Sequence, residues 1–190
     1  MKFDPSIEIT EDDRVYPPSE DSVLLIEAFD VVTGEALLEI GCGSGIVSLH
    51  CVKNGAVVTC GDLNEKAVAL TKKNAELNAL GLCVMHTNVY SDITGQYDTI
   101  LFNLPYLPVD EEGELAISWS GGNDGLGPLP ALLGGAPSHL NPNGRIIVVV
   151  SSLMDQDRLS DLLSEYTVRT LSELPLFFEK LRVLEIRLNR

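Results

Sequence analysis

The sequence has few cysteines, few histidines and no long apolar run. Its 190 residues include 4 cysteines and 3 histidines, all dispersed and without a Cys-x-x-Cys pair. This spacing argues against a disulfide framework or a metal site, and free, buried thiols are the better prediction. The longest aliphatic run, Ile146 to Val150, is far too short to span a bilayer, so no membrane helix is expected.

Basic residues are also scarce, with 13 Lys and Arg against 28 Asp and Glu and a net charge of −15. A protein that follows a nucleic acid backbone needs a basic stripe, so direct nucleic acid binding is not expected. Carboxylates cluster at residues 11–13, 20–21 and 110–112. Two explanations stay open, a solvated surface in a high-salt cytosol or an acidic rim that attracts a basic partner.

The amino terminus, residues 1–5, has neither a basic region nor an apolar stretch. It therefore lacks the pattern of a secretory signal, and we expect a cytoplasmic protein.

A short apolar run, residues 98–102, ends abruptly in Asn103. This pattern predicts a buried strand that delivers Asn103 to the edge of a sheet. Pro105 disfavours helical angles at Leu104, so the Leu104 carbonyl is expected to lie extended beside the Asn103 amide. Together the two oxygens can accept both hydrogens of a planar NH2 group, with Tyr106 as a flat wall. Taken alone, Asn-x-Pro-Tyr is more typical of a turn.

A glycine loop, residues 41–45, follows a predicted buried strand at 36–40 and precedes a predicted helix. Glycines at such a junction let a ligand approach the backbone at the positive end of the helix. A dinucleotide fingerprint would need Gly or Ala where Ile46 stands. The loop therefore suits a ligand with a sugar and an amino acid moiety but no pyrophosphate.

Polar residues follow the next two predicted strands, at 56–61 and 82–87. Asp62 stands where a carboxylate that binds ribose hydroxyls belongs, with Leu63 beside the adenine. The alternative for Asp62 is an N-cap of the following helix, predicted over 64–80 and closed by a glycine at 81. Asn88 stands where the adenine amino group could be recognised.

The remaining pattern predicts strands at 144–150, 166–171 and 181–188 and helices from Ser19, over 126–140 and over 154–164. The fold class is therefore α/β, a single Rossmann-like domain over residues 1–190 with an extended arm at 1–14. Its sheet would have seven strands, mostly parallel with the last one antiparallel, and helices on both faces. The long segment 108–127, which contains Trp119, is expected to cover the substrate.

Several motifs occur together and in a consistent order. The Leu38–Gly45 segment, Asp62 and the Asn-Leu-Pro-Tyr tetrapeptide resemble class I S-adenosylmethionine-dependent methyltransferases. The segments 16–22 and 119–125 resemble the HemK/PrmC family, which methylates the glutamine of the Gly-Gly-Gln loop in peptide-chain release factors. The short segment before the first motif resembles the archaeal and eukaryotic branch.

The resemblance implies S-adenosylmethionine as cofactor, a release factor as substrate and a heterodimer with a small zinc-binding activator subunit at a sheet edge. It implies that Asn103, Leu104, Pro105 and Tyr106 form the catalytic motif. The residues that it implies for the cofactor are Tyr16, Pro18, Glu20, Asp21, Ser22, Glu39, Gly41, Gly43, Gly45, Asp62, Leu63, Asn88, Val89 and Asn103.

The sequence departs from the family pattern at two positions. Leu104 replaces a proline, and Asn88 replaces an aspartate that many members have. Because the family uses only the backbone carbonyl at the position of Leu104, a leucine there should be tolerated. Three other functions stay open: N6-adenine methylation of DNA or RNA, lysine methylation of a protein, and a binding partner of the same fold without catalysis.

Overall fold

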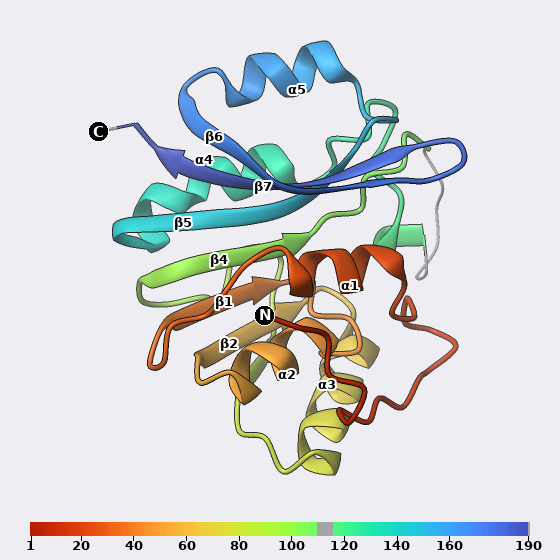
Figure 1. The fold of residues 1–190 in the computed structure, drawn as a ribbon, viewed down its shortest axis with the longest axis vertical. Helices are drawn as coiled ribbons and strands as arrows, with labels where there is room; N and C mark the ends of the chain where they lie inside the picture. Colours follow the sequence, from red (N-terminus) through yellow and green to blue (C-terminus); the bar gives the residue numbers. More distant parts are fainter. Residues whose placement is uncertain (110–115, 190) are drawn as a thin grey trace.

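The computed structural model describes residues 1–109 and 116–189, apart from the side chain of residue 117. Figure 1 shows one sheet with helices packed along it. The helices are α1 (Glu20–Glu27), α2 (Ile46–Lys53), α3 (Glu65–Leu77), α4 (Leu129–His139) and α5 (Gln156–Leu163), with a short 3-10 helix at Ala116–Ser118. The strands are β1 (Ala36–Ile40), β2 (Val57–Asp62), β3 (Cys83–His86), β4 (Tyr97–Asn103), β5 (Leu140–Ser151), β6 (Tyr166–Pro175) and β7 (Lys180–Leu188).

The sheet has seven strands in the order β3-β2-β1-β4-β5-β7-β6. Neighbours from β3 to β5 are parallel, whereas β7 is antiparallel to both β5 and β6. This confirms the predicted fold class. The strand order reverses between β1 and β4, and in open parallel sheets ligands bind outside the carboxyl ends of the strands at such a reversal.

Two apolar clusters bury the faces of the sheet. Side chains of α1 and α2 pack against one face, where α3 joins them through a smaller cluster with α2. Side chains of α4 and α5 pack against the other face. The central strands β1, β4 and β5 contribute to both clusters, because successive residues of a strand point to opposite faces. Within the part of the chain that the structure describes, no helix is long and apolar enough to cross a bilayer.

Within the described residues, no helix or strand precedes Glu20, and the arm is held by hydrogen bonds to α2 and α3. Asn78 shows how the arm shapes α3. Its side chain donates to the Glu8 carbonyl (2.7 Å) and to the Asn74 carbonyl (2.7 Å), and it is the C-cap of α3. The predicted cap at Gly81 is therefore wrong, because a contact with the distant arm closes the helix three residues earlier.

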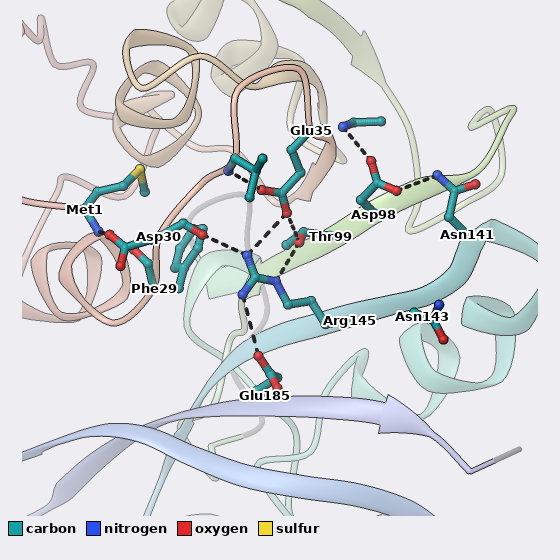
Figure 2. Close-up of polar contacts among 12 residues, drawn as sticks. Met1, Phe29, Asp30, Glu35, Asp98, Thr99, Asn141, Asn143, Arg145 and Glu185 are labelled. Carbon is teal, nitrogen blue, oxygen red and sulfur yellow. Dashed lines mark hydrogen bonds and ion pairs between the residues drawn. The ribbon is translucent and has the colours of Figure 1, made fainter.

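Charged residues gather at the amino end of the sheet (Figure 2). The Arg145 guanidinium donates to the Asp30 carbonyl (2.8 Å) and the Thr99 hydroxyl (2.9 Å). It also pairs with the buried carboxylates of Glu35 (3.3 Å) and Glu185 (3.6 Å). The Thr99 hydroxyl in turn donates to Glu35. We refer to Asp30, Glu35, Thr99, Arg145 and Glu185 as the Arg145 cluster.

Candidate functional site

A cavity of about 550 Å³ opens at the carboxyl ends of the strands, where the strand order reverses. Its size is in the usual range for small-molecule sites. It is lined by residues that precede α1, by the glycine loop, by the ends of β2, β3 and β4, and by the segment around Trp119. The two ends that the sequence singled out, the glycine loop after β1 and Asn103 on β4, therefore meet in one cavity.

At Gly41 the glycine loop packs too closely against its neighbours for a larger residue. Gly41 has a φ of 68°, and a Cβ atom there would lie 2.6 Å from the Phe102 ring. The N–H groups of Gly41 and Cys42 both donate to the Gly61 carbonyl, at 2.8 and 3.1 Å. Because Gly supplies the left-handed angle without a side chain, the loop can bend over the end of β2 and leave the cavity open.

Asp62 is the last residue of β2 and lies at the cavity. One carboxylate oxygen accepts the Gly43 N–H (2.9 Å) and the other accepts the Asn64 N–H (2.8 Å). Burial raises the pKa of Asp62, although these backbone donors oppose the shift. The N-cap of α3 is Asn64, so the alternative role predicted for Asp62 is wrong. Each oxygen retains a lone pair for a further donor.

Glu39 lies beside the glycine loop and is 2% exposed. It accepts a hydrogen bond from the Ser48 hydroxyl of α2. Burial raises the pKa of Glu39 to about 8, against the opposing effect of the Ser48 hydrogen bond. The carboxyl group is therefore mostly protonated at neutral pH in this structure, and it can donate as well as accept.

Asn103 ends β4 at the cavity wall. Its side-chain oxygen, Oδ1, is buried and is the one buried side-chain polar atom without a hydrogen-bond partner among the described residues. Leu104 beside it is 2% exposed and packs in the core with α4, so its side chain has a structural role. What Leu104 can offer a ligand is its backbone carbonyl.

Tyr106 is held in place by Asp21, which is 85 residues earlier in the chain. The phenol donates to the Asp21 carboxylate (3.3 Å), which also accepts the Ser22 N–H (2.6 Å). Burial, and then the negative charge of Asp21, raise the pKa of Tyr106, so the phenol stays protonated. Tyr16 lines the same cavity, and its hydroxyl donates to the Ser19 hydroxyl (3.4 Å). The helix α1 and the tetrapeptide thus form one wall.

The segment 119–125 packs directly on that wall. The Leu107 N–H donates to the Trp119 carbonyl (3.0 Å), and the Gly121 N–H donates to the Leu107 carbonyl (2.8 Å). Gly125 has a φ of 71°, and a Cβ there would lie 2.7 Å from the Tyr106 carbonyl. Trp119 lines the cavity, so this part of the segment borders the site. Residues 110–115, with the acidic group 110–112, lie outside the described residues.

The cavity includes every predicted site residue except Glu20 and Gly45. Glu20 is exposed and accepts from the Ser19 hydroxyl (3.2 Å), while Gly45 is the N-cap of α2. The sequence did not single out Thr87 or Phe102, which also line the cavity. Each directly precedes a predicted site residue at the end of a strand. That position is the sequence signal that could have identified them.

The described residues include no group of three or more His, Cys, Asp or Glu side chains placed to hold a metal ion. The four cysteines are free; three are buried and Cys83 is exposed.

Residues 19–173 match the family model of the methyltransferase small domain. The chain belongs to this family. This methyltransferase is 35% identical in sequence, over 178 residues, to the putative protein N5-glutamine methyltransferase MJ0928 of Methanocaldococcus jannaschii. The match covers 90% of each chain. It is 31% identical over 151 residues to methyltransferase HEMK2 of Mus musculus, covering 71% of each. The predicted membership of the HemK/PrmC group is thereby confirmed.

Two solved structures share the fold of this methyltransferase. The Mtq2 protein of E. cuniculi, in a complex with Trm112 that methylates the termination factor eRF1, has a TM-score of 0.74. It is 18% identical, and the match covers 93% of this chain and 99% of that one. A 16S rRNA methyltransferase of T. thermophilus in complex with AdoMet and guanosine has a TM-score of 0.68 and 22% identity, covering 91% and 44%. At these identities the likeness establishes the fold.

Proposed function

We propose that this methyltransferase methylates the side-chain amide nitrogen of a glutamine in a peptide-chain release factor, with S-adenosylmethionine as the methyl donor. The observation that carries the proposal is the buried Asn103 Oδ1, which has no hydrogen-bond partner among the described residues and lies at the cavity beside the glycine loop. A buried acceptor is costly to leave unpaired, so its partner is expected from a ligand. An NH2 group is a suitable donor.

The residues of the cavity fit the cofactor. The Asp62 carboxylate keeps lone pairs for the two ribose hydroxyls, and the adenine would lie by Leu63, Asn88 and Val89. The glycine loop and Glu39 would hold the amino acid moiety, and Tyr16, Pro18, Asp21 and Ser22 would close the other side. When bound, S-adenosylmethionine supplies an electrophilic methyl group on a sulfonium. Glu20 and Gly45 would act indirectly, since neither lines the cavity.

The chain's own task is to make a poor nucleophile react. An amide nitrogen is weakly nucleophilic because its lone pair is delocalised into the carbonyl. Asn103 Oδ1 and the Leu104 carbonyl would each accept one amide hydrogen, which fixes the nitrogen and favours a tetrahedral geometry. Positioning and preorganised acceptors of this kind can supply several kcal/mol toward a barrier. Pro105 would orient the Leu104 carbonyl, and Tyr106 and Trp119 would flank the substrate side chain.

No strong base is required in this arrangement. Once the nitrogen has gained a methyl group it carries a positive charge, and its proton is acidic enough to leave to water. The buried Tyr106 phenol stays protonated because burial and the Asp21 charge raise its pKa, so it acts as a fixed wall.

Two observations support a release factor as the substrate. The relative MJ0928 is named a putative protein N5-glutamine methyltransferase, and the Mtq2 complex acts on the termination factor eRF1. The net charge of −15 also disfavours a nucleic acid substrate. N6-adenine methylation of DNA or RNA is the second candidate, because the exocyclic NH2 group of adenine would offer two hydrogens to the same pair of acceptors. Release factors work in translation, so we place the protein in the cytoplasm.

We further propose a small zinc-binding activator subunit as partner, added along strand β3. This strand forms one edge of the sheet, and a groove runs beside it that is lined mainly by apolar side chains together with Lys72 and Glu76. An edge strand has unpaired backbone groups that another strand can complete. The Mtq2 structure is a complex with a second protein, Trm112.

The test is methyl transfer from labelled cofactor to purified release factor, to a release factor with the loop glutamine changed to alanine, and to RNA and DNA. We expect label on the intact factor alone, at the glutamine amide by mass spectrometry. Label on nucleic acid would favour the second candidate. Label on no substrate, with the activator subunit present, would indicate a binding partner without catalysis.

A further inference from the structure

The hairpin between β6 and β7 ends in two exposed phenylalanines. Phe177 is 92% exposed and Phe178 is 85% exposed. Their rings meet edge to face with centroids 4.5 Å apart, and the turn is closed by a hydrogen bond from the Leu176 N–H to the Glu179 carbonyl (2.7 Å). The rings contribute almost nothing to the core, so folding does not explain them. Large exposed aromatic groups are typical of surfaces that bind a partner.

The hairpin tip is attached to the carboxyl edge of the sheet, where the cavity opens. Glu179 accepts from the Ser151 hydroxyl at the end of β5 (2.6 Å), and the Lys180 N–H donates to the Ser152 hydroxyl (2.9 Å). Glu179 is also close enough to the cavity wall to affect Tyr106. Burial, then the charge of Asp21 and then that of Glu179 raise the pKa of Tyr106. In Figure 1 the hairpin extends past α1 on the side where β4 ends. The hairpin tip therefore lies at the end of the sheet at which the cavity opens.

The cavity is too small for more than a cofactor and one side chain. At about 550 Å³ it can hold a ligand of ordinary size, so a protein substrate must rest on the surface around it. Three carboxylates lie on the side of the cavity that faces the hairpin. After burial, the nearby charges of Asp21, Glu20 and Glu179 raise the pKa of Tyr16 at the cavity wall. A protein with an apolar pocket bordered by basic side chains would complement it.

We propose that Phe177 and Phe178 dock the release factor itself, by entering an apolar pocket on that protein while its loop glutamine enters the cavity. This inference rests on the proposed function and names the surface that the substrate protein contacts. The hairpin thus distinguishes the intact factor from its isolated loop. Aromatic side chains are the usual anchors of such interfaces, and truncating one commonly costs more than tenfold in affinity.

The experiment compares two double variants with the wild type, all assayed with the activator subunit where one copurifies. The first is Phe177→Ser with Phe178→Ser. The matched control is Val32→Ser with Val57→Ser, which removes two apolar side chains, 70% and 67% exposed, from the opposite end of the sheet. Each protein is given the intact release factor or a short synthetic peptide of its Gly-Gly-Gln loop, and KM, kcat and cofactor affinity are measured.

For the phenylalanine variant we expect KM for the intact factor to rise by about tenfold or more, with kcat and cofactor affinity unchanged. KM for the peptide should stay within about twofold, and the control should match the wild type. An unchanged KM for the intact factor would overturn the docking role, as would an equal rise for the peptide. If the wild type forms a dimer and the phenylalanine variant does not, while KM is unchanged, the tip serves self-association. That result would also overturn the docking role.

Failure of the proposed function has a different outcome. If the wild type transfers no methyl group to the factor or the peptide, both the function and the docking role fall. If the wild type is active and the phenylalanine variant equals it, only the docking role falls.

Discussion

The two ends of the sheet differ in how their buried polar groups are satisfied. At the amino end, Arg145 joins Glu35, Thr99 and Glu185 in one connected cluster. At the carboxyl end, the buried Asn103 Oδ1 has no partner in the described part of the chain. Buried polar groups of a folded protein are normally paired within it. The paired end therefore maintains the fold, and the unpaired end indicates where a ligand completes the structure.

The buried acidic side chains at the two ends of the sheet also differ in the direction of their pKa shifts. Burial raises the pKa of Glu39 at the carboxyl end to about 8. Burial also acts on Glu185 at the amino end, but Arg187, Arg169 and Arg145 outweigh it and lower the pKa of this group. One sheet thus holds a buried carboxylic acid at one end and a buried carboxylate at the other. The neighbouring arginines account for the difference.

The largest effect is expected from Asn103→Ala. Removing the acceptor should reduce single-turnover methyl transfer to the release factor by about a thousandfold, which corresponds to about 4 kcal/mol. Cofactor binding, measured by calorimetry, should be nearly intact, because the glycine loop and Asp62 are untouched. Appreciable turnover in the variant would show that Asn103 does not hold the substrate amide.

Leu104→Pro is the matched control at the next position. It keeps the backbone carbonyl and should keep turnover. Because Leu104 is buried in the core, the variant should also unfold more easily. Loss of turnover in a folded variant would contradict the role assigned to the carbonyl.

The second prediction concerns Glu39 and pH. Its folded pKa of about 8 lies above its ordinary 4.5, so between these values the folded state binds more protons than the unfolded state. Stability without ligand should therefore fall as pH rises from about 4.5 to about 8, by on the order of 4 kcal/mol from this group. Glu39→Gln should remove that fall relative to the wild type in urea titrations across this range. Parallel pH profiles of the two proteins would show that Glu39 is charged in the fold.

The third prediction tests the amino end. Arg145→Met should reduce the free energy of unfolding by about 2 kcal/mol, because Glu35 and Glu185 lose their shared partner. Cofactor affinity should not change. Arg158→Met is a suitable control, since that side chain is 64% exposed in its pair with Asp124 and should contribute little. Equal effects of the two variants would mean that the Arg145 cluster does not stabilise the fold.

The smallest effect is expected from Asp62→Ala. Loss of the ribose acceptor should weaken S-adenosylmethionine binding by at least about tenfold, or about 1.4 kcal/mol. Asp62→Asn keeps one acceptor oxygen and should lose less. Unchanged affinity in the folded alanine variant, measured by calorimetry, would remove Asp62 from the site.

The sequence predicted the centre of the fold better than its margins. Strand β1 has the predicted bounds, and β4 ends at Asn103 as predicted. Both strands are short apolar runs that end in a glycine or a polar residue, so local pattern was sufficient. Helix α3 ends early because Asn78 bonds to the distant Glu8, and β5 begins earlier than its aliphatic run. Such ends depend on contacts between remote segments, which a local pattern does not contain.

The site shows the same limit. The strand-end residues Asn103 and Asp62 could be placed at one cavity because carboxyl ends of parallel strands meet at one edge. The bond from Tyr106 to Asp21 and the packing of Gly125 on the Tyr106 carbonyl could not be predicted from spacing. Both join segments that are far apart in sequence, and only the folded chain brings them together.

The position of β7 has a consequence for synthesis of the chain. Among the described residues β7 is the last strand in sequence, yet it lies between β5 and β6. During translation β5 and β6 emerge before the strand that must separate them, so neither can complete its pairing until Lys180–Leu188 has left the ribosome. Until then the long apolar strand β5 presents an open edge, which is the kind of surface that aggregates. Pairing of this part of the sheet therefore cannot be completed before β7 is available.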